Sequence, residues 1–270
     1  MSLVQQSAHD VMAPIVNALE QLSSHEEVQF WWRDDDAEVS SPALDRLLAL
    51  STDTGVPVGL AVIPGHLEQS LATHLSAAND VDVLVHGWIH KNHAPKGDPA
   101  SEYPLSRHID DVRGELAHSL AVLHEAFPQK TLPVFVPPWN RLPAEFEDLL
   151  VECGYVGLSG ASGNSLQNPG TASLRRAHCD LNIVVKPGAG CGADIRGAAF
   201  VAKSIRAGER GPFGVVTHHR LFDDATWKLC ELFWKSIASF ESVQAVSPRQ
   251  VFHTEGMSEH TASRHVIRNN

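Results

Sequence analysis

The chain has 270 residues, of which 43% are hydrophobic and 20% charged, a composition typical of globular proteins and unlike that of disordered or fibrous chains. Its 32 acidic and 21 basic residues give a formal net charge of −11, which argues against binding to nucleic acids or anionic membranes. The four cysteines form no C-x-x-C pair. The N-terminus lacks the pattern of a signal peptide, and no apolar run is long enough to span a membrane. We therefore expect a cytoplasmic protein with reduced thiols.

Short apolar runs alternate with amphipathic stretches along most of the chain. The apolar runs predict strands at residues 28–32, 56–63, 81–85, 132–136, 155–158, 181–185, 213–217 and 243–246. The amphipathic stretches predict helices at residues 42–52, 107–127, 143–153, 194–207 and 223–240. This alternation predicts an α/β fold, a distorted seven-stranded (β/α) barrel, with an open doubly wound sheet as the alternative. We expect a single catalytic domain over residues 1–252 and a polar tail over 253–270.

Polar side chains follow several of the predicted strands, at the point where each strand ends. In parallel α/β folds the active site lies at the carboxyl ends of the strands. These ends carry the segments Arg33-Asp34-Asp35-Asp36, His86-Gly87-Trp88-Ile89-His90, Pro137-Pro138-Trp139-Asn140-Arg141 and His218-His219-Arg220. We therefore expect acids, imidazoles and a tryptophan to meet at one rim of the sheet.

The acidic run and the two spaced histidines predict a metal site. Asp34, Asp35 and Asp36 follow an apolar strand, where neighbouring carboxylates repel one another, so a divalent cation is the expected neutralising partner. Two imidazoles and one carboxylate leave a coordination position open for water, as in catalytic zinc sites. A chain with 16 histidines contains about one H-x-x-x-H pair by chance, so the spacing of His86 and His90 alone does not indicate a metal site. Their position directly after a predicted strand is what favours one. The alternative is two loop histidines and a solvated acidic turn.

These residue types suit hydrolysis. A second aspartate beside a metal-activated water can act as general base, and a histidine on the opposite side can donate a proton to the leaving group. The chemistry expected from the set is metal-assisted hydrolysis of an amide or an ester.

A glycine-rich segment, Gly188-Ala189-Gly190-Cys191-Gly192, lies between a predicted strand and a predicted helix. A phosphate or dinucleotide loop would occupy such a place, but the segment lacks the G-x-G-x-x-G spacing and a following acid for the ribose. It is therefore interpreted as a tight βα turn.

The order and strand placement of these motifs resemble the polysaccharide deacetylases, the NodB-homology group also called carbohydrate esterase family 4 (CE4). That family carries a T-F-D-D-G motif, an H-[ST]-x-x-H motif, an R-x-P-[YW] motif and a late L-H motif. The similar segments of this chain are residues 33–37, 86–90, 136–139 and 217–218. The resemblance implies a NodB-like barrel that spans nearly all of the predicted strands.

The resemblance also implies a role for each polar residue of the first two motifs. Asp35 would be the general base, and Asp36, His86 and His90 would hold one divalent metal. Zinc is the expected ion, and cobalt, nickel, iron or manganese would also suit imidazole and carboxylate ligands.

The later motifs imply the general acid and the substrate groove. His218 would protonate the departing amine, with the adjacent His219 as the alternative. Trp139 would offer an apolar face to a sugar ring. Its neighbours Pro138, Asn140 and Arg141 would complete the substrate-binding wall.

The chain departs from the family pattern at two positions. Gly87 stands where Ser or Thr is usual, and Val136 stands where the family has an arginine that orients and charges the catalytic aspartate. Arg33 or Arg141 is the candidate substitute for that arginine. Asp34 is a further candidate site residue, and no segment matches the family's D-x-x-D-W motif.

The expected function is metal-dependent hydrolysis of a C–N amide bond, namely N-deacetylation of an acetamido sugar or glycan precursor. A small-molecule or glycan substrate is the expected partner. Two alternatives remain open at this point: a metal-dependent hydrolase of a non-sugar amide, and a catalytically silent barrel that binds glycan.

Overall fold

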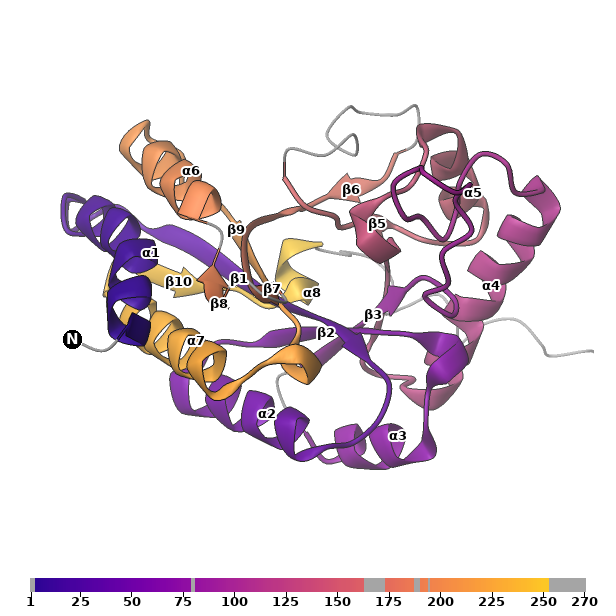
Figure 1. Ribbon diagram of the computed structural model, residues 1–270, viewed down its shortest axis with the longest axis horizontal. Coiled ribbons are helices and arrows are strands. Elements are labelled where there is room, and N and C mark those ends of the chain that lie inside the picture. Colours follow the sequence, from indigo (N-terminus) through magenta and orange to yellow (C-terminus); the bar gives the residue numbers. More distant parts are fainter. Residues whose placement is uncertain (1–2, 79–80, 163–172, 187–189, 194, 253–270) are drawn as a thin grey trace, which may run out of the picture.

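The computed structural model describes residues 3–78, 81–162, 173–186, 190–193 and 195–252. Its strands form one sheet that curls into a distorted half-barrel with helices along the outside (Figure 1). The expected α/β barrel-like fold is therefore confirmed. No described helix is long and apolar enough to cross a membrane. The residues predicted as a polar tail, 253–270, lie outside the described part of the chain.

Parallel strands form the wall of the half-barrel, in the spatial order β5-β4-β3-β2-β1-β9-β7. Their bounds are β1 Val28–Ala37, β2 Val58–Val62, β3 Val81–His86, β4 Thr131–Val136, β5 Gly157–Leu158, β7 Cys179–Lys186 and β9 Phe213–Thr217. Three short strands extend this wall: β6 (Arg175–Arg176) beside β5, β8 (Gly190–Ala193) antiparallel to β7, and β10 (Val243–Ala245) beside the start of β1. Cys179 exchanges backbone hydrogen bonds with Gly160 and Ser162 just after β5, so the two edges of the wall meet there.

Side chains of the wall are buried on both faces. Successive residues of a strand point to opposite faces, and Trp31 and Trp32 show the consequence. Trp32 packs outward on Trp234 of α7 (Asp224–Ile237), with ring centroids 5.0 Å apart. Trp31 points inward, into an apolar cluster that includes Ala61, Leu84, Val134, Val136 and Val216. Continuous apolar runs such as residues 56–63 are typical of strands buried in this way.

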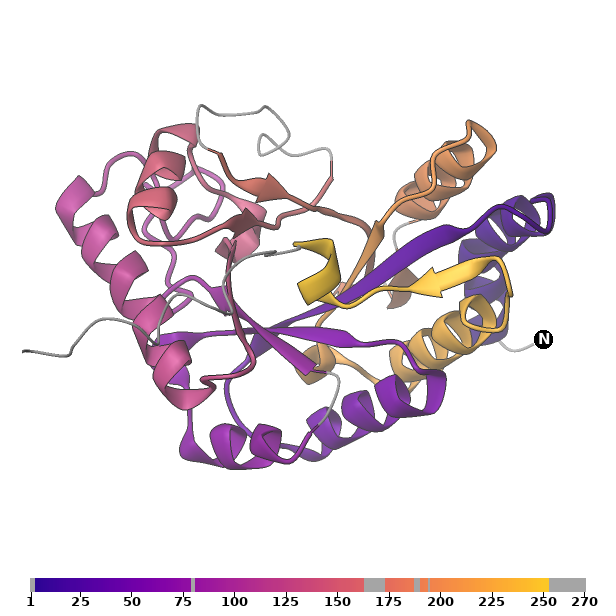
Figure 2. The same cartoon turned by 180° about the vertical axis from the view of Figure 1, so that it is seen from behind.

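Helices cover the outer face in groups (Figures 1 and 2). Helix α1 (Leu3–Leu19) packs against α6 (Ile195–Arg206) and α7, whereas α4 (Ile109–Ala126) packs against α5 (Glu147–Glu152). Between them, α2 (Pro42–Thr54) follows β1 and α3 (Gln69–Ser76) follows β2. Helix α2 begins where its sequence predicts, because the Ser41 hydroxyl accepts the Leu44 N–H at 3.2 Å and Pro42 occupies the first turn.

The inside of the half-barrel is filled at one end by the last described segment. Helix α8 (Pro248–Val251) lies within the curl of the sheet (Figure 2). The Phe252 ring meets the Trp31 ring edge-on, with centroids 5.8 Å apart. A Cβ on Gly157 would stand 2.6 Å from the Phe252 ring, so a larger residue on β5 would clash with this plug.

The structure differs from the sequence-based expectations in a few elements. The turn expected at 188–192 is wrong for residues 190–192, which belong to β8 and hydrogen-bond to β7, while 188 and 189 lie outside the described residues. Glycine-rich segments carry little strand signal, and β7 supplies the pairing that sequence reasoning lacked. Helices α1 and α3 were not predicted. The predicted helix at 143–153 is a 3₁₀ turn, Ala144–Phe146, followed by α5.

Candidate metal centre

Strand β1 is longer than its apolar run predicts and carries the acidic segment to the rim. Arg33 and Asp35 share the inward face with Trp31, whereas Asp34 shares the outward face with Trp32. The pairing of β1 with β2 shifts register between Asp34 and Ala37. At this irregularity Asp36 adopts a left-handed backbone with φ 68°. The local break in alternation brings the Asp36 carboxylate toward the end of β3.

Asp36, His86 and His90 form a compact cluster of metal-ligand atoms. The Asp36 Oδ1 atom lies 3.0 Å from His86 Nε2 and 3.5 Å from His90 Nε2. Two ligands on a tetrahedral zinc with bonds near 2.1 Å would be separated by about 3.4 Å. The three groups expected to bind metal are therefore brought together with spacing that suits an ion, and among the described residues they form a potential ligand set for one ion.

The hydrogen bonds of His86 favour a cation at this cluster. His86 Nδ1 lies 2.9 Å from the carbonyl oxygen of Val136, which can only accept, so Nδ1 carries a proton. In a neutral imidazole the Nε2 lone pair would then face the Asp36 carboxylate, an arrangement of two acceptors that repel. Either a second proton or a metal ion removes this repulsion. The residues therefore fit a divalent cation, with the Val136 carbonyl fixing the tautomer of its imidazole ligand.

The pKa values of the cluster reflect the same electrostatics. Burial alone would raise the pKa of Asp36, but the hydrogen bond from His86 and the charges of His86, His218 and His90 lower it well below its usual range. Burial alone would lower the pKa of His86, but its contacts with Asp36 and the nearby charge of Asp35 raise it. Burial and the His86 charge lower the pKa of His90. The negative charge of the aspartates is thus directed at the place where a cation would bind.

Backbone strain concentrates at this rim. The described non-glycine residues with positive φ are Asp36 (68°), His90 (52°), Trp139 (54°) and Asn140 (55°). His90 and Trp139 also contact each other, with ring centroids 4.3 Å apart. Such conformations cost on the order of 1–3 kcal/mol each and cluster at functional sites. Their gathering around one potential ligand set is independent support for a site here.

Asp35 and Arg33 form a buried ion pair. The Arg33 Nε lies 2.8 Å from Asp35 Oδ1 and Nη2 lies 3.0 Å from Oδ2, with the two residues 0% and 2% exposed. Arg33 Nη1 also donates to the Ser159 hydroxyl at 2.6 Å. Arg33 thus lies next to Asp35, where the family pattern would place the arginine of its third motif. Arg141, the other candidate for this role, donates instead to the Ala100 carbonyl.

The two histidines after β9 face different surroundings. His219 is buried, and its Nδ1 and backbone N–H both bond the Asp34 carboxylate, which also accepts from the Thr217 hydroxyl at 2.6 Å. Asp34 outweighs the effect of burial and raises the pKa of His219. His218 lies close enough to Asp36 for its charge to lower the pKa of that carboxyl. The structure therefore brings His218 to the metal-ligand cluster and turns His219 toward the outer face of the sheet.

The segment after β4 forms the wall beside the ligands. Pro138–Asn140 is a 3₁₀ turn in which Pro138 is buried and Trp139 is half-buried against His90. The Asn140 side-chain oxygen accepts from Arg33 Nη2 at 3.1 Å, so this residue connects the wall to the buried ion pair. Arg141 is exposed at the edge. Their roles toward a substrate stay predictions.

Sequence reasoning missed Glu102. This carboxylate is 0% exposed and accepts the backbone N–H of Trp88 at 3.1 Å and of Ile89 at 2.8 Å, between His86 and His90. Burial raises its pKa, while the backbone hydrogen bonds and the His86 charge oppose the shift. Glu102 follows no strand and belongs to no spaced motif. Gly87 was the one indirect sign of Glu102 in the sequence, because a residue without a side chain leaves room for another side chain beside it.

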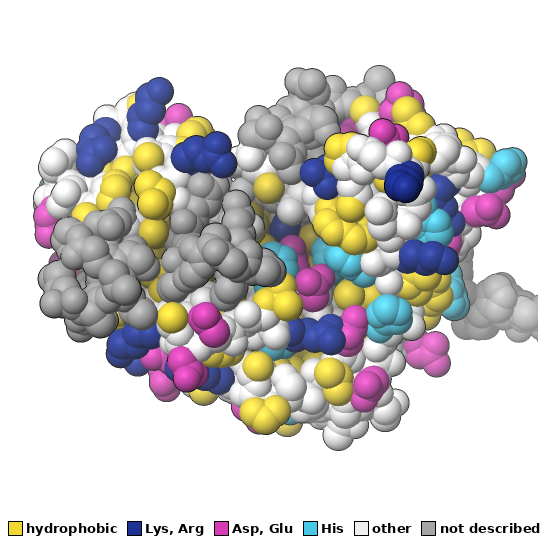
Figure 3. All heavy atoms as spheres, viewed as in Figure 1, with side chains coloured by type: hydrophobic (Ala, Val, Ile, Leu, Met, Phe, Trp, Pro, Cys, Tyr) yellow, Lys and Arg dark blue, Asp and Glu magenta, His cyan; other side chains and the backbone are white. Residues whose placement is uncertain are grey.

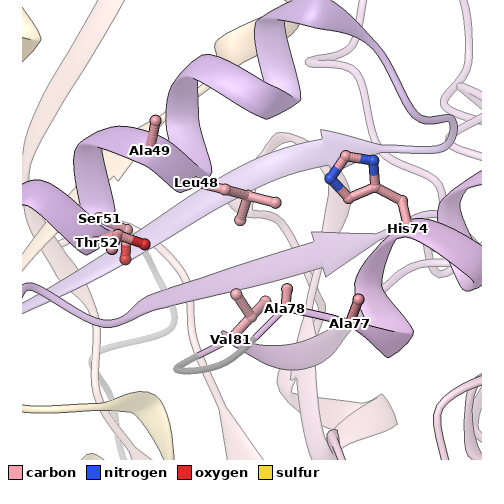
Figure 4. A pocket seen from close by; sticks show the side chains of 8 residues that line it. All are labelled: Leu48, Ala49, Ser51, Thr52, His74, Ala77, Ala78 and Val81. Carbon is pink, nitrogen blue, oxygen red and sulfur yellow. The ribbon is translucent and has the colours of Figure 1, made fainter.

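A pocket also lies between α2 and α3 (Figure 4). Its volume is about 420 Å³, and small apolar side chains such as Leu48, Ala77 and Val81 line it. His74 is its one imidazole, with Nδ1 2.9 Å from the Ser40 hydroxyl and Nε2 3.4 Å from Asp45. The described lining brings together no cluster of catalytic or metal-binding groups. By contrast, Figure 3 shows histidine and acidic side chains gathered at a hollow near the middle of the molecular face.

Comparison with known proteins identifies relatives by structure only. No protein-family model and no curated protein matches the sequence. A protein from Mycobacterium smegmatis assigned to the polysaccharide deacetylases superposes with a TM-score of 0.60 at 15% identity, over 86% of this chain and 91% of that chain. The chain has the fold of the CE4 deacetylases. At this low identity the match establishes the CE4 fold and leaves the activity open.

Two further CE4 structures share this fold. A family 4 acetyl xylan esterase from Clostridium thermocellum in complex with cobalt has a TM-score of 0.51 and 14% identity, over 83% of this chain and 90% of that chain. A mutant of a CE4 pseudoenzyme with restored activity has a TM-score of 0.54 and 13% identity, over 92% and 84% of the two chains. The fold therefore occurs in a protein with a bound cobalt ion and also in a CE4 pseudoenzyme.

Proposed function

We propose that this protein is a divergent CE4 hydrolase that uses a divalent metal to cleave a C–N amide bond. The observation that carries the proposal is the convergence of His86 Nε2 and His90 Nε2 on one oxygen of Asp36, at 3.0 and 3.5 Å. The fold shared with CE4 deacetylases supports it, and so does the cobalt complex of one CE4 structure. Zinc is the ion we expect, because imidazole and carboxylate ligands suit it.

A divalent ion held by these three residues would polarise an amide carbonyl and lower the pKa of a water molecule. Asp35 is the proposed general base. Each of its oxygens accepts one hydrogen bond from Arg33 and keeps a further lone pair that can accept a proton. Arg33 would hold this carboxylate in a fixed orientation.

His218 is the proposed general acid. Its Nδ1 is buried and has no hydrogen-bond partner among the described residues, and its charge reaches Asp36. A departing amine between Asp36 and His218 could therefore receive a proton from this ring. Trp139 is the proposed platform for a substrate ring, and an acetamido sugar or glycan precursor is the substrate class that we propose.

A second candidate function is glycan binding without turnover. The bidentate contact with Arg33 favours it, because a carboxylate that is 2% exposed and bonded through both oxygens to one guanidinium is also typical of a structural ion pair. The existence of a CE4 pseudoenzyme shows that this fold can lose its activity. Hydrolysis of a non-sugar amide uses the same residues and differs only in the substrate.

Metal content and acetate release together test the proposal. Purified wild-type protein should contain about one transition metal per chain, and His86→Ala should lose it. Wild type loaded with zinc or cobalt should release acetate from N-acetylated sugars, whereas Asp35→Asn should retain metal and release none. Metal binding with no release from either protein would favour the binding module. Failure of wild type to bind zinc or cobalt would refute both the site and the hydrolase.

A further inference from the structure

Glu102 lies beneath the segment that joins the two histidine ligands. The segment 87–89 separates His86 from His90 and contributes two backbone N–H groups to one carboxylate. Oε2 accepts from Trp88 and Oε1 accepts from Ile89, so a single side chain fixes two consecutive peptide units. No other described side chain bonds these two N–H groups in the structure.

Gly87 makes room for this carboxylate. A Cβ at Gly87 would stand 2.0 Å from Glu102 Oε2 and 2.5 Å from the ring of Pro138, and its φ of 62° is unfavourable for most other residues. Position 87, where the resembled family usually has Ser or Thr, is therefore a glycine because a side chain there would clash with Glu102 and Pro138. Glu102, which occupies the space beside Gly87, lies outside the motif of residues 86–90.

The conformation of the segment explains why it requires such a support. Gly87 and His90 both have positive φ, and for a non-glycine residue such as His90 this conformation persists only where the surrounding structure holds it. Removal of the Glu102 carboxylate would leave the N–H groups of the half-buried residues Trp88 and Ile89 without this partner. The segment would then relax, and the separation of His86 Nε2 from His90 Nε2 would no longer be fixed.

Glu102 is itself held firmly in place. It is fully buried, and the neighbouring Tyr103 is buried against Phe135 of β4. The Glu102 carbonyl also accepts from Arg107, which forms a double hydrogen bond with Glu115 of α4. The carboxylate is therefore a rigid support that is anchored to the wall and to a covering helix.

We infer that Glu102 is a positioning residue for the metal centre, which sets the geometry of His86 and His90 through the backbone between them. The inference rests on the proposed metal site and adds a residue that touches neither metal nor substrate. Loss of such supporting partners typically lowers metal affinity about 10–100-fold.

Glu102→Gln is the sharpest variant, because it preserves size and replaces one acceptor oxygen by an NH₂ group that faces a backbone N–H. Zinc affinity is measured by competition with a chelator, and the visible spectrum of the cobalt-loaded protein reports the coordination geometry. We expect about 10–100-fold weaker zinc binding and an altered cobalt spectrum.

Glu147→Gln is the matched control. Glu147 is an equally buried acid, 2% exposed, and it pairs with Arg176 away from the ligand cluster. This control should keep wild-type metal affinity even where it lowers the melting temperature. If Glu102→Gln does not fold, Glu102→Asp is used in its place. Its shorter side chain keeps the negative charge but moves the carboxylate oxygens away from the N–H groups of Trp88 and Ile89.

The outcomes separate this inference from the proposed function. Wild-type affinity in a folded Glu102 variant, with an unchanged cobalt spectrum, would overturn the positioning role and leave the metal site standing. An equal loss of affinity in Glu147→Gln would overturn it too, because the effect would then be general destabilisation. A wild type that binds neither metal would overturn the site and the inference together.

Discussion

Removal of the Arg33 side chain should destabilise the protein more than any surface ion-pair change. In Arg33→Met the Asp35 carboxylate stays buried and loses both guanidinium hydrogen bonds, of 2.8 and 3.0 Å. Breaking a buried pair by removing one partner costs about 3–5 kcal/mol. An unfolding entropy of about 2.1 cal/mol/K per residue gives about 0.57 kcal/mol/K for 270 residues, so the melting temperature should fall by about 5–9 °C.

The assay is thermal unfolding in the presence of a chelator, so that metal binding does not contribute. Arg33→Met/Asp35→Leu is the informative double variant, because it removes both charges and should recover most of the lost stability. Arg113→Met is the surface control, since Arg113 and Glu152 form an exposed pair and the change should leave the melting temperature nearly unaltered. A single Arg33 variant as stable as this control would refute the view that Asp35 depends on Arg33.

Three other predictions concern the two histidines after β9, the metal centre and the barrel plug. His219→Gln should lower the melting temperature because Asp34 loses its buried partner, whereas His218→Gln should leave stability near wild type and impair acetate release; equal melting temperatures would contradict the assignment. Zinc affinity should rise as the pH increases above about 6.5, the ordinary imidazole pKa, because the contacts with Asp36 outweigh burial and raise the pKa of His86. The second proton of His86 competes with the metal until it dissociates, and a flat pH profile in chelator competition would contradict this. Phe252→Ala should cost about 3–5 kcal/mol in urea unfolding, since it leaves a cavity beside Trp31; a loss below about 1 kcal/mol would show that the plug collapses into the space.

The strands were predictable because the fold buries them on both faces. Runs such as 56–63 and 213–217 are continuously apolar, and this pattern needs no tertiary information to be recognised. The β8 hairpin strand was not predictable in the same way, because Gly190 and Gly192 carry no side chains that would indicate a strand. Pairing with β7 supplies the missing stabilisation, and only the folded chain shows it.

The candidate ligands could be found from the sequence because each follows a strand. Asp36 and His86 lie at the carboxyl ends of β1 and β3, which flank β2, and parallel topology places these ends on the same edge of the sheet. Glu102 lies sixteen positions beyond His86 in an irregular connection, where sequence position gives no hint of spatial proximity. The division of roles between His218 and His219 was also beyond sequence reasoning. It depends on Asp34, whose carboxylate points outward and binds His219.

The alternation of side chains along β1 explains why position 136 can be a valine. Residues two apart on a strand share a face, so Arg33 and Asp35 form their ion pair within β1 and require no arginine from β4. Val136 is then free to fill the apolar interior with its side chain while its carbonyl oxygen binds His86 Nδ1. The absence of an arginine at position 136 suggests loss of function when the motif is considered alone. In the folded chain, Arg33 of β1 supplies the guanidinium group that the family pattern places on β4. The charge beside Asp35 is retained, and a test of activity should therefore begin with Arg33 rather than with restoration of an arginine at position 136.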